Sequence, residues 1–494
     1  MPLAPKLDAA SAAKNLDEVK PPYAPQEALV EANRCLFCFD APCIMACPTG
    51  IDIPSFIKKI ATDNVVGSAR VILSANILGA SCARVCPTEV LCEGACVMLD
   101  KEKEPIKIGR LQRYATDHVF NNNIKLFQPT KKKVGKKVAV IGAGPAGLGC
   151  AAELAQMGYD VTIFEKREKG GGLNTFGIAY YKMKPEVSLE EVALVESLGV
   201  EIRYSVEVGK DISVEELDKK FDAIFLGVGL GDTQKLGIPG EDAKGVVDAL
   251  EFIEQIHTQP LHKVPVGDRV AVVGCGNTAI DASTQSKRLG ASHVHVIYRR
   301  GEKEMPAYDF EYELAKSDGV EFLFNTLPLE VLKDNAGNVR GMKLAKTRVA
   351  AGKVEVIPGS EYEEVFDMII PAVGQEKQKS WIQKVFPKLE IDKKGVIIND
   401  PQTKQTSEKK IFCGGDCANG GREVVNAVGE GKKAALGIHN FLMGEKVDSE
   451  VQPSRHGLKE GRPTGSGLRN PVRAPELEEA YFSTNGNGNG HKKA

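Results

Sequence analysis

KKVAVIGAGPAGLGCAAELAQMGYDVTIFEK, residues 136–166, is the stretch that decides the fold of this chain. A short apolar strand runs directly into Gly142, Gly144 and Gly147, which open a helix, and a second strand follows that helix. In this arrangement the first glycine permits a tight turn, the second lets the backbone approach a pyrophosphate, and the third lets the helix pack on the strand. Glu165 closes the second strand, where a carboxylate can accept the hydroxyls of an adenosine ribose. The stretch therefore predicts a dinucleotide-binding βαβ unit.

The same arrangement recurs at residues 268–300, DRVAVVGCGNTAIDASTQSKRLGASHVHVIYRR. Gly274 and Gly276 follow a strand, and an alanine takes the third position, which the motif permits. The second strand ends at Arg299 and Arg300 instead of an acid. Guanidinium groups there suit a 2′-phosphate and favour NADP over NAD, although two arginines at a strand end can also form a solvated face.

Apolar strands alternate with helices from Lys137 onward, which indicates parallel sheets built from βαβ units. The clearest predicted strands are Lys137–Ile141, Asp160–Glu165, Ala223–Gly227, Arg269–Val273 and His293–Arg299. Before them, residues 26–120 show a helical, cysteine-rich pattern, and the polar, basic residues 121–137 are typical of a linker. A length of 494 residues fits about three domains.

Eight of the twelve cysteines fall in the first hundred residues. They form two blocks, Cys35, Cys38, Cys43 and Cys47, then Cys82, Cys86, Cys92 and Cys96. An iron–sulfur cluster needs about four soft thiolates, and the last cysteine of such a block commonly ligates the other cluster. Structural zinc is a second interpretation, but only the first pair has the Cys-x2-Cys spacing usual for zinc. A disulfide framework is a third, and the N-terminal residues lack the apolar core of the signal peptide that it would call for.

The composition, 42% hydrophobic and 26% charged, is that of an ordinary globular protein. A net charge of −2 gives no general attraction to nucleic acid or to an anionic membrane. No apolar run approaches the roughly 20 residues that span a bilayer. We therefore expect a cytoplasmic, reducing location, with no nucleic acid and no membrane as partner.

A third motif assigns cofactors to the two glycine motifs. A predicted strand, Lys410–Cys413, is followed by Gly415 and Asp416 and then by a helix. This resembles the closing motif of flavoproteins with two dinucleotide-binding domains, in which the aspartate binds the FAD ribitol. The resemblance implies FAD at the first glycine motif and NAD(P)H at the second. Cys413 and Cys417 lie in this motif without Cys-x2-Cys spacing, so we expect buried structural thiols rather than a redox dithiol.

Residues 25–445 resemble the electron-input half of dihydropyrimidine dehydrogenase and the small subunit of glutamate synthase. The dehydrogenase family is matched through EANRCLFCFDAPCIMACPTGIDIPSFI, CARVCPTEVLCEGAC and EPIKIGRLQRYATD. This resemblance implies two [4Fe-4S] clusters, one held by Cys35, Cys38, Cys43 and Cys96, the other by Cys47, Cys86, Cys92 and Gln112. Cys82, which spacing alone would nominate, becomes a spare thiol. An amide in place of a thiolate removes one negative charge, which by itself raises the potential of that cluster.

The same resemblance implies the nucleotide-binding residues. For FAD they are Gly142, Gly144, Pro145, Ala146, Gly147, Glu165, Lys166, Gly172, Leu173, Lys182, Val208, Gly415 and Asp416, with Lys182 where an arginine is common. For NAD(P)H they are Gly274, Gly276, Asn277, Thr278, Arg299, Arg300, Ala372 and Gly374. A further basic residue that some members use for the 2′-phosphate corresponds to Pro306, and bacterial two-subunit members use NADH, so the choice between NADH and NADPH stays open.

The predicted fold class is multi-domain: an N-terminal all-α double [4Fe-4S] domain and two Rossmann-like α/β domains, the NAD(P)H domain being inserted into the FAD domain. The helical domain is expected at residues 1–127 and the FAD domain at 128–240 and 372–445. The NAD(P)H domain is expected at 241–371. Residues 446–494 lack periodicity and are predicted to form an extended tail that can order on a partner.

The resemblance implies a function in electron delivery. Hydride would pass from NAD(P)H to FAD, and single electrons would pass through two clusters to a partner subunit. No catalytic side chain is predicted, because the hydride passes between cofactors. The expected partner holds FMN and [4Fe-4S] clusters and reduces uracil or thymine. Because this chain ends without the FMN-binding barrel, it resembles the separate NAD(P)H-oxidising subunit of the bacterial two-subunit enzyme, in a hetero-oligomer.

Two alternatives remain at this stage. One is a glutamate synthase small subunit, for which we expect an Ile-Glu pattern at position 112 where this chain has Gln112. The other is a non-enzymatic redox-sensing cluster protein, which the two intact glycine motifs disfavour.

Overall fold

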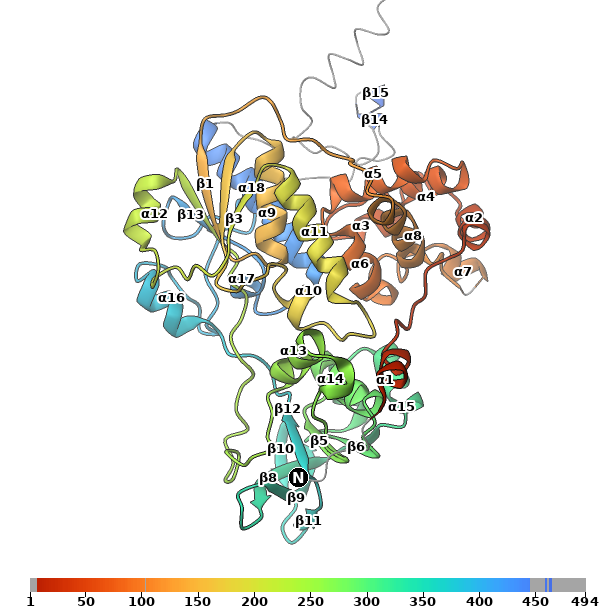
Figure 1. The fold of residues 1–494 in the computed structure, drawn as a ribbon, viewed down its shortest axis with the longest axis vertical. Helices are drawn as coiled ribbons and strands as arrows, with labels where there is room; N and C mark the ends of the chain where they lie inside the picture. The colour runs from red at the N-terminus through yellow and green to blue at the C-terminus, as the bar shows by residue number, and fades with distance from the viewer. Residues whose placement is uncertain (1–6, 103, 445–457, 460–461, 464–494) are drawn as a thin grey trace, which may run out of the picture. The chain divides into compact units, whose positions relative to one another are not determined.

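The computed structural model describes residues 7–102, 104–444, 458–459 and 462–463 (Figure 1). The chain forms two compact units. Unit 1 comprises Met1–Pro21, Leu173–Glu186 and Leu230–Lys377, and unit 2 comprises Pro22–Gly172, Val187–Gly229 and Gln378–Ala494.

The first part of unit 2 is helical, as the sequence predicts. Its elements are α2 (Pro25–Asn33), α3 (Pro42–Met45), α4 (Ile53–Ala61), α5 (Val65–Ala75), α6 (Gly79–Val85), η1 (Thr88–Val90), α7 (Met98–Glu102) and α8 (Ile108–Asn121). Asp52 caps α4 by accepting a hydrogen bond from the Ser55 amide at 3.1 Å. Phe56, Ile57, Ile72 and Leu111 fill the core between these helices.

The second part of unit 2 is a five-stranded parallel sheet in the order β13-β4-β1-β2-β3. Its strands are β1 (Lys137–Ile141), β2 (Asp160–Phe164), β3 (Glu201–Arg203), β4 (Ala223–Leu226) and β13 (Ile411–Cys413). The helices around it are α9 (Pro145–Gln156), α11 (Pro185–Ser197), α12 (Val214–Lys220), α16 (Lys379–Val385), α17 (Asp416–Asn419) and α18 (Val424–Met443). α18 packs along α9 (Figure 1), so the C-terminal helix closes the first glycine motif's own domain.

Unit 1 holds a four-stranded parallel sheet in the order β12-β5-β6-β7. Its strands are β5 (Arg269–Val273), β6 (His293–Ile297), β7 (Glu321–Leu323) and β12 (Met368–Pro371). An antiparallel sheet of β8 (Thr326–Lys333), β9 (Val339–Ala350), β10 (Lys353–Val356) and β11 (Tyr362–Glu364) accompanies it. The helices are α1 (Ala9–Asn15), α10 (Leu173–Phe176), α13 (Ala249–Thr258), η2 (Leu261–Lys263), α14 (Asn277–Arg288), η3 (Glu302–Glu304) and α15 (Asp309–Ser317). The two parallel sheets confirm the predicted fold class.

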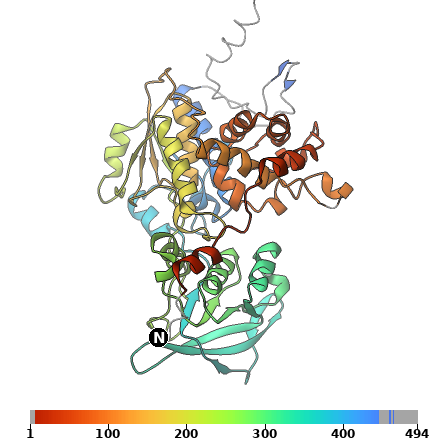
Figure 2. The same ribbon diagram turned by 45° about the vertical axis from the view of Figure 1, so that its right-hand side comes forward.

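Two segments lie in a different part of the fold from the one the sequence assigned. Residues 7–21, expected in the helical domain, pack in unit 1, where Leu16 is fully buried and α1 lies beside the helices of that unit (Figure 2). Residues 173–186, expected in the FAD domain, also belong to unit 1. Tyr181 in that segment is fully buried, and its hydroxyl donates to Asp281 at 2.9 Å. Both segments are short and bury few apolar side chains, Ala12 and Leu16 in the first and Ala179, Tyr181 and Met183 in the second. The sequence therefore placed both segments by their neighbours in the chain.

No single helix among the described residues is long and apolar enough to cross a membrane. α5 and α6 pass that test of length and composition only as a pair, and they are bent by 89° at the break between them. The predicted tail, 446–494, lies outside the described residues except for β14 (Leu458–Lys459) and β15 (Arg462–Pro463), which pair antiparallel.

Candidate functional site

Two glycines of the first motif are required by the fold itself. Gly142 has a φ of +99°, and a Cβ there would lie 2.6 Å from the Gly227 carbonyl oxygen. A Cβ on Gly147 would lie 1.9 Å from the carbonyl oxygen of Gly142. These glycines therefore permit the turn after β1 and the close packing of α9, as the motif predicts.

Gly144 is different, because nothing in the described chain demands a glycine there. Its φ is −78°, which any residue adopts, and the nearest neighbour of an added Cβ is Gly172 Cα at 4.0 Å. Gly144 is also the N-cap of α9, whose first backbone amides have no partner within the helix. The open space beside these amides fits the phosphates of a dinucleotide.

Glu165 lies at the carboxyl end of β2, next to this turn, and is only 7% exposed. Its carboxylate accepts hydrogen bonds from the Ala143 amide at 2.8 Å and the Arg167 amide at 2.9 Å. These bonds fix the side chain and leave each oxygen able to accept another, as a ribose requires. Lys166 follows it and is exposed.

The closing motif, Gly415 and Asp416, begins next to the first turn of α9. Gly415 has a φ of +73°, and a Cβ there would be 2.9 Å from the Cβ of Ala146, the residue after Pro145. The Gly415 amide donates to Glu430 on α18 at 2.7 Å. Asp416 follows at the start of α17 and accepts from the Arg422 amide at 3.1 Å. The fold thus brings Asp416 to the first glycine motif, and Glu430 is a supporting residue that no sequence signal identified.

The remaining predicted FAD residues are divided between the two units. Leu173 and Lys182 belong to unit 1. Lys182 Nζ is paired there with Asp281 at 2.7 Å and with Glu311 at 2.6 Å, and both carboxylates favour its charged form, so its pKa is raised although burial opposes this. Val208 is buried in an apolar cluster of unit 2. Their contacts with FAD stay predictions.

The second glycine motif repeats the pattern of the first. Gly274 has a φ of +128°, and its Cβ would meet the Ala372 carbonyl oxygen at 2.2 Å. Gly276 has a φ of −91°, and the nearest neighbour of its Cβ is Pro306 Cγ at 4.0 Å. Gly274 thus serves the turn, whereas Gly276 leaves room for a ligand at the N-terminus of α14.

Several other predicted NAD(P)H residues surround this turn. Asn277 Oδ1 accepts from the Tyr308 amide at 3.2 Å. Thr278 and Arg299 are exposed and Arg300 is half-buried, so these side chains are accessible to a ligand. Gly374 has a φ of +104°, and a Cβ added there would have no described atom within 4 Å beyond its chain neighbours. Pro306, which replaces a basic residue of some family members, lies against Gly276 and thus at the site itself.

Four cysteines line one cavity in the helical domain. They are Cys35, Cys38, Cys43 and Cys96, the set implied for the first cluster. The other walls are apolar and include Ile53, Ile57 and Ile106. Burial raises the pKa of Cys43 to about 12 and that of Cys35 to about 11. Bound iron reverses this preference, because a coordinating thiol is deprotonated.

The arrangement of the cysteine side chains around this cavity is relevant to the zinc interpretation. Among the described residues, no three His, Cys, Asp or Glu side chains converge closely enough to hold a single metal ion. Thiols spread around a cavity wall fit a multi-iron cluster better than they fit one zinc ion.

Some of the residues implied for the second cluster also lie close to one another. The pKa of Cys86 is raised by the side-chain hydrogen bond between Cys86 and Cys82 and by burial, with smaller effects of the Cys92 and Cys47 charges. Burial raises the pKa of Cys92, and Cys47 adds to the shift. Gln112 on α8 is 6% exposed and donates through Nε2 to the Gly79 carbonyl at 2.7 Å. Its Oε1 is then the atom that can bind iron, and the choice between Gln112 and Cys82 stays a prediction.

The other four cysteines are buried thiols. Cys417 Sγ donates weakly to the Leu226 and Gly414 carbonyls at 3.5 and 3.4 Å, and burial raises its pKa to about 12. Cys413, Cys150 and Cys275 are at most 2% exposed. Buried neutral thiols are unreactive, which fits structural roles and not a redox dithiol.

Two family models match the chain. Residues 12–124 match the model described as dihydropyrimidine dehydrogenase domain II, 4Fe-4S cluster, and residues 136–431 match the pyridine nucleotide-disulphide oxidoreductase model. The glutamate synthase [NADPH] small chain of Escherichia coli K12 is 37% identical over 445 residues, which cover 86% of this chain and 93% of that relative. The NAD-dependent dihydropyrimidine dehydrogenase subunit PreT of the same strain is 35% identical over 429 residues, covering 87% and 98%.

Among solved structures, Mycobacterium tuberculosis FprA in complex with NADPH superimposes with a TM-score of 0.52 at 19% identity, covering 63% of this chain and 85% of that one. This likeness shows the fold alone. The two family models and the oxidoreductase relatives confirm the predicted cofactor types, FAD, [4Fe-4S] and NAD(P)H. The number of clusters stays a prediction.

Proposed function

This chain belongs to the pyridine nucleotide-disulphide oxidoreductase family and carries a 4Fe-4S domain of the dihydropyrimidine dehydrogenase kind before it, and from that premise we propose the function of an electron-input subunit. It is an NAD(P)H-dependent flavin and iron–sulfur oxidoreductase. Its proposed task is to oxidise NAD(P)H and deliver the electrons, in the cytoplasm, to a separate catalytic subunit.

One observation carries this proposal: the cysteine-bearing helices and the first glycine motif share one compact unit. A Cβ on Gly429 of α18 would lie 2.8 Å from the carbonyl oxygen of Pro48, the residue after Cys47. The same helix packs on α9, where a Cβ on Gly431 would meet the Ala146 carbonyl oxygen at 2.2 Å. The second cysteine set is therefore joined to the proposed FAD site through a single helix, which supports electron passage inside unit 2.

The cofactors supply the chemistry when bound, namely hydride acceptance and one-electron transfer. The protein's own residues bind and orient them. Gly144 and Gly276 leave space at two helix N-termini, where unpaired amides bind phosphates. Glu165 holds a carboxylate ready for the ribose, and mostly apolar side chains surround the first cysteine set. No side chain is needed as an acid or base at the hydride step.

We propose dihydropyrimidine dehydrogenase as the whole enzyme, with a partner that reduces uracil or thymine. Gln112 supports this, because the family resemblance expects glutamine there and an Ile-Glu pattern in the glutamate synthase small subunit. The second candidate is that small subunit, supported by the 37% identity to the Escherichia coli chain. The relatives' names, "subunit" and "small chain", support a hetero-oligomer in either case.

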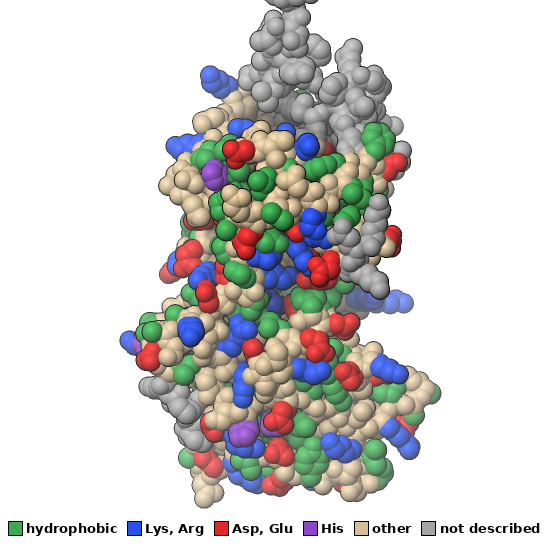
Figure 3. Space-filling model, turned by 90° about the vertical axis from the view of Figure 1, so that its right-hand side faces the viewer, with side chains coloured by type: hydrophobic (Ala, Val, Ile, Leu, Met, Phe, Trp, Pro, Cys, Tyr) green, Lys and Arg blue, Asp and Glu red, His purple; other side chains and the backbone are tan. Residues whose placement is uncertain are grey.

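Exposed apolar side chains on the helical domain also support a partner. Val30 is 67% exposed, Phe39 58%, Met45 72% and Val90 58%. Hydrophobic side chains lie among charged ones on the face shown in Figure 3. Two of these residues, Phe39 and Met45, lie between cysteines of the first block, where an electron acceptor would need to approach.

The test is to purify the chain anaerobically, measure flavin and iron, and follow flavin bleaching on addition of NADH or NADPH. We expect both cofactors to be present and the flavin to bleach. Absence of flavin and iron refutes the proposal. Co-expression with the protein of the neighbouring reading frame then separates the candidates: turnover of uracil or thymine supports the first, and glutamine-dependent glutamate formation replaces it by the second.

A further inference from the structure

The corner between α5 and α6 joins the helical domain to the sheet domain of unit 2. Its residues Ile77 and Leu78 are 5% and 1% exposed. They belong to the apolar core around β1 and α9, together with Val138 and Leu154, and not to the core of the helical domain. The corner is therefore inserted into the domain that carries the first glycine motif.

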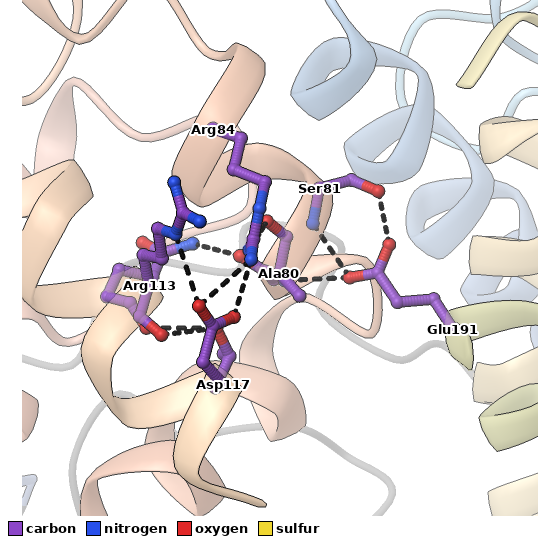
Figure 4. A network of polar contacts seen from close by, with 9 residues as sticks. Ala80, Ser81, Arg84, Arg113, Asp117 and Glu191 are labelled. Atoms are coloured by element: carbon purple, nitrogen blue, oxygen red, sulfur yellow. Dashed lines mark hydrogen bonds and ion pairs between the residues drawn. The ribbon is translucent and has the colours of Figure 1, made fainter. Parts of the chain in front are cut away.

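A buried carboxyl group contacts the corner at the start of α6. Glu191 on α11 is fully buried and accepts hydrogen bonds from the Ala80 amide at 2.7 Å and the Ser81 amide at 3.0 Å (Figure 4). The Ser81 hydroxyl also donates to it. These amides belong to the first turn of α6, where a negative charge is favoured by the helix dipole.

A lysine side chain contacts the corner at the end of α5. Lys432 on α18 donates to the carbonyl oxygen of Ala75, the last residue of α5, and lies 3.5 Å from that of Thr49. Its charge is matched by Glu153 on α9 at 3.6 Å, and both side chains are at most 15% exposed. A cation at a helix C-terminus is again the favoured sign. The corner thus lies between two buried polar side chains, the Glu191 carboxyl at the N-terminus of α6 and the Lys432 ammonium at the C-terminus of α5, each bonded to the helix end that it contacts.

The corner is linked to three of the four residues proposed for the second cluster. α6 leads directly into Cys86. Gln112 donates to the carbonyl of Gly79, the first residue of α6. The Thr49 hydroxyl lies 3.3 Å from the sulfur of Cys47, and its carbonyl faces Lys432.

α6 and α8 are also tied to each other. Arg84 on α6 holds the Asp117 carboxylate at 2.7 and 2.9 Å, and Arg113 reaches the same carboxylate at 3.1 Å (Figure 4). Because of this ion-pair network, a shift of α6 at the corner moves α8 and its ligand residue as well.

We propose that Glu191 and Lys432 are positioning residues that fix the second cluster-binding set against the flavin-binding domain. This rests on the proposed function. In the electron step that they serve, the reduced flavin loses one electron and the cluster gains it, with no bond formed or broken. The two side chains act on the distance and orientation between these groups and touch neither of them.

The test uses the holoprotein and separates hydride transfer from electron passage. In anaerobic stopped-flow mixing with NADH or NADPH, whichever the wild type uses, flavin bleaching reports the first step. Freeze-quenched EPR signals of the reduced clusters report the second. The variants are Glu191→Ala, and Lys432→Met combined with Glu153→Gln so that no buried charge is left alone. Glu191→Gln and Glu153→Gln are the conservative partners, and the exposed neighbours give the controls Glu190→Gln and Lys433→Met.

We expect both disruptive variants to slow cluster reduction by about threefold or more, because the rate of electron transfer falls as the distance between the flavin and the cluster grows, and misplacing groups that a fold positions slows their reaction. Flavin bleaching should stay within about twofold of wild type, since the second glycine motif belongs to unit 1. Glu191→Gln keeps an acceptor oxygen and should restore most of the rate. In a redox titration, Lys432→Met with Glu153→Gln should also change the EPR signal or the midpoint potential of one cluster only.

Wild-type cluster reduction and unchanged EPR signals in both disruptive variants overturn the inference. If Glu191→Ala does not fold, the Lys432 variant decides the outcome alone. Failure of the proposed function has a different signature, because the wild type itself then shows no flavin bleaching with either nucleotide or no cluster signal.

Discussion

Glu191→Gln is expected to change how the stability of the protein depends on pH. The Glu191 carboxyl is fully buried, and burial raises its pKa from an ordinary 4.5 to about 7, against the opposing effect of the Ser81 and Ala80 hydrogen bonds and of Arg84. A pKa raised in the folded state means that the fold binds the proton more tightly than the unfolded chain does. The contribution to stability is therefore fully present below about pH 4.5 and is lost as the pH rises through about 7.

The magnitude follows from the same values. The difference between 4.5 and about 7 corresponds to about 3 kcal/mol in total. Between about pH 5.5 and about pH 8, about 2 kcal/mol of it is lost in the wild type. Glutamine cannot titrate, so the stability of the variant relative to the wild type should rise by that amount over this interval. The shift in melting temperature should amount to a few degrees.

The assay is thermal unfolding of the holoprotein and the variant in parallel across this pH interval, with Glu190→Gln as the control. Only the change of the variant-minus-wild-type difference with pH is interpreted, because other groups titrate equally in both proteins. The control should give a flat difference. A flat difference for Glu191→Gln, or one that moves in favour of the wild type as the pH rises, refutes the reasoning.

Three further outcomes are expected. Gly144→Ala should lower the stability by at most about 1 kcal/mol but abolish FAD retention, measured by flavin absorbance. Gly147→Ala, in contrast, should prevent folding, because its Cβ would lie 1.9 Å from a carbonyl oxygen. Cys82→Ser should keep the wild-type iron content, while Gln112→Leu should lose one cluster by iron assay and EPR; the reverse result would make Cys82 the ligand. Arg299→Ser should raise KM for NADPH more than KM for NADH, and equal effects would show that the exposed arginine is only a solvated face.

The parallel sheets and both glycine turns were predictable because the strand, the glycines and the helix follow one another in a short local pattern. Gly142 and Gly274 have a positive φ, which favours glycine, and a Cβ on Gly147 would collide with the carbonyl oxygen of Gly142 in the same motif. The middle glycines are the complementary case. The fold would accept a side chain at Gly144 and at Gly276, and the proposed binding of dinucleotide phosphates would account for glycine at both positions. The sequence identifies the glycine motif, but only the structure distinguishes the glycines that backbone packing requires from those that leave space for a ligand.

Other features depend on partners that are distant in the chain. Lys182 aligns with a flavin contact by sequence, yet the structure pairs it with Asp281 and Glu311, about a hundred residues and more away. Residues 7–21 bury only Ala12 and Leu16, too few apolar side chains to show which unit the segment packs in. The antiparallel sheet of unit 1 was also not anticipated, since its strands pair across irregular register shifts between Pro328 and Glu330 and between Leu332 and Lys333.

The contact between the helical and sheet domains of unit 2 could have been built from apolar residues alone, since Ile77 and Leu78 already insert into the neighbouring core. Apolar contacts are non-directional, so they stabilise an interface without fixing its register. Glu191 and Lys432 add directed bonds to backbone groups at two helix ends, and burying charges costs free energy that apolar side chains would not. This cost is explained if the fold must hold the second cysteine set in one defined position, and not merely stabilise the interface. An electron carrier needs such a fixed geometry, whereas a structural metal domain does not.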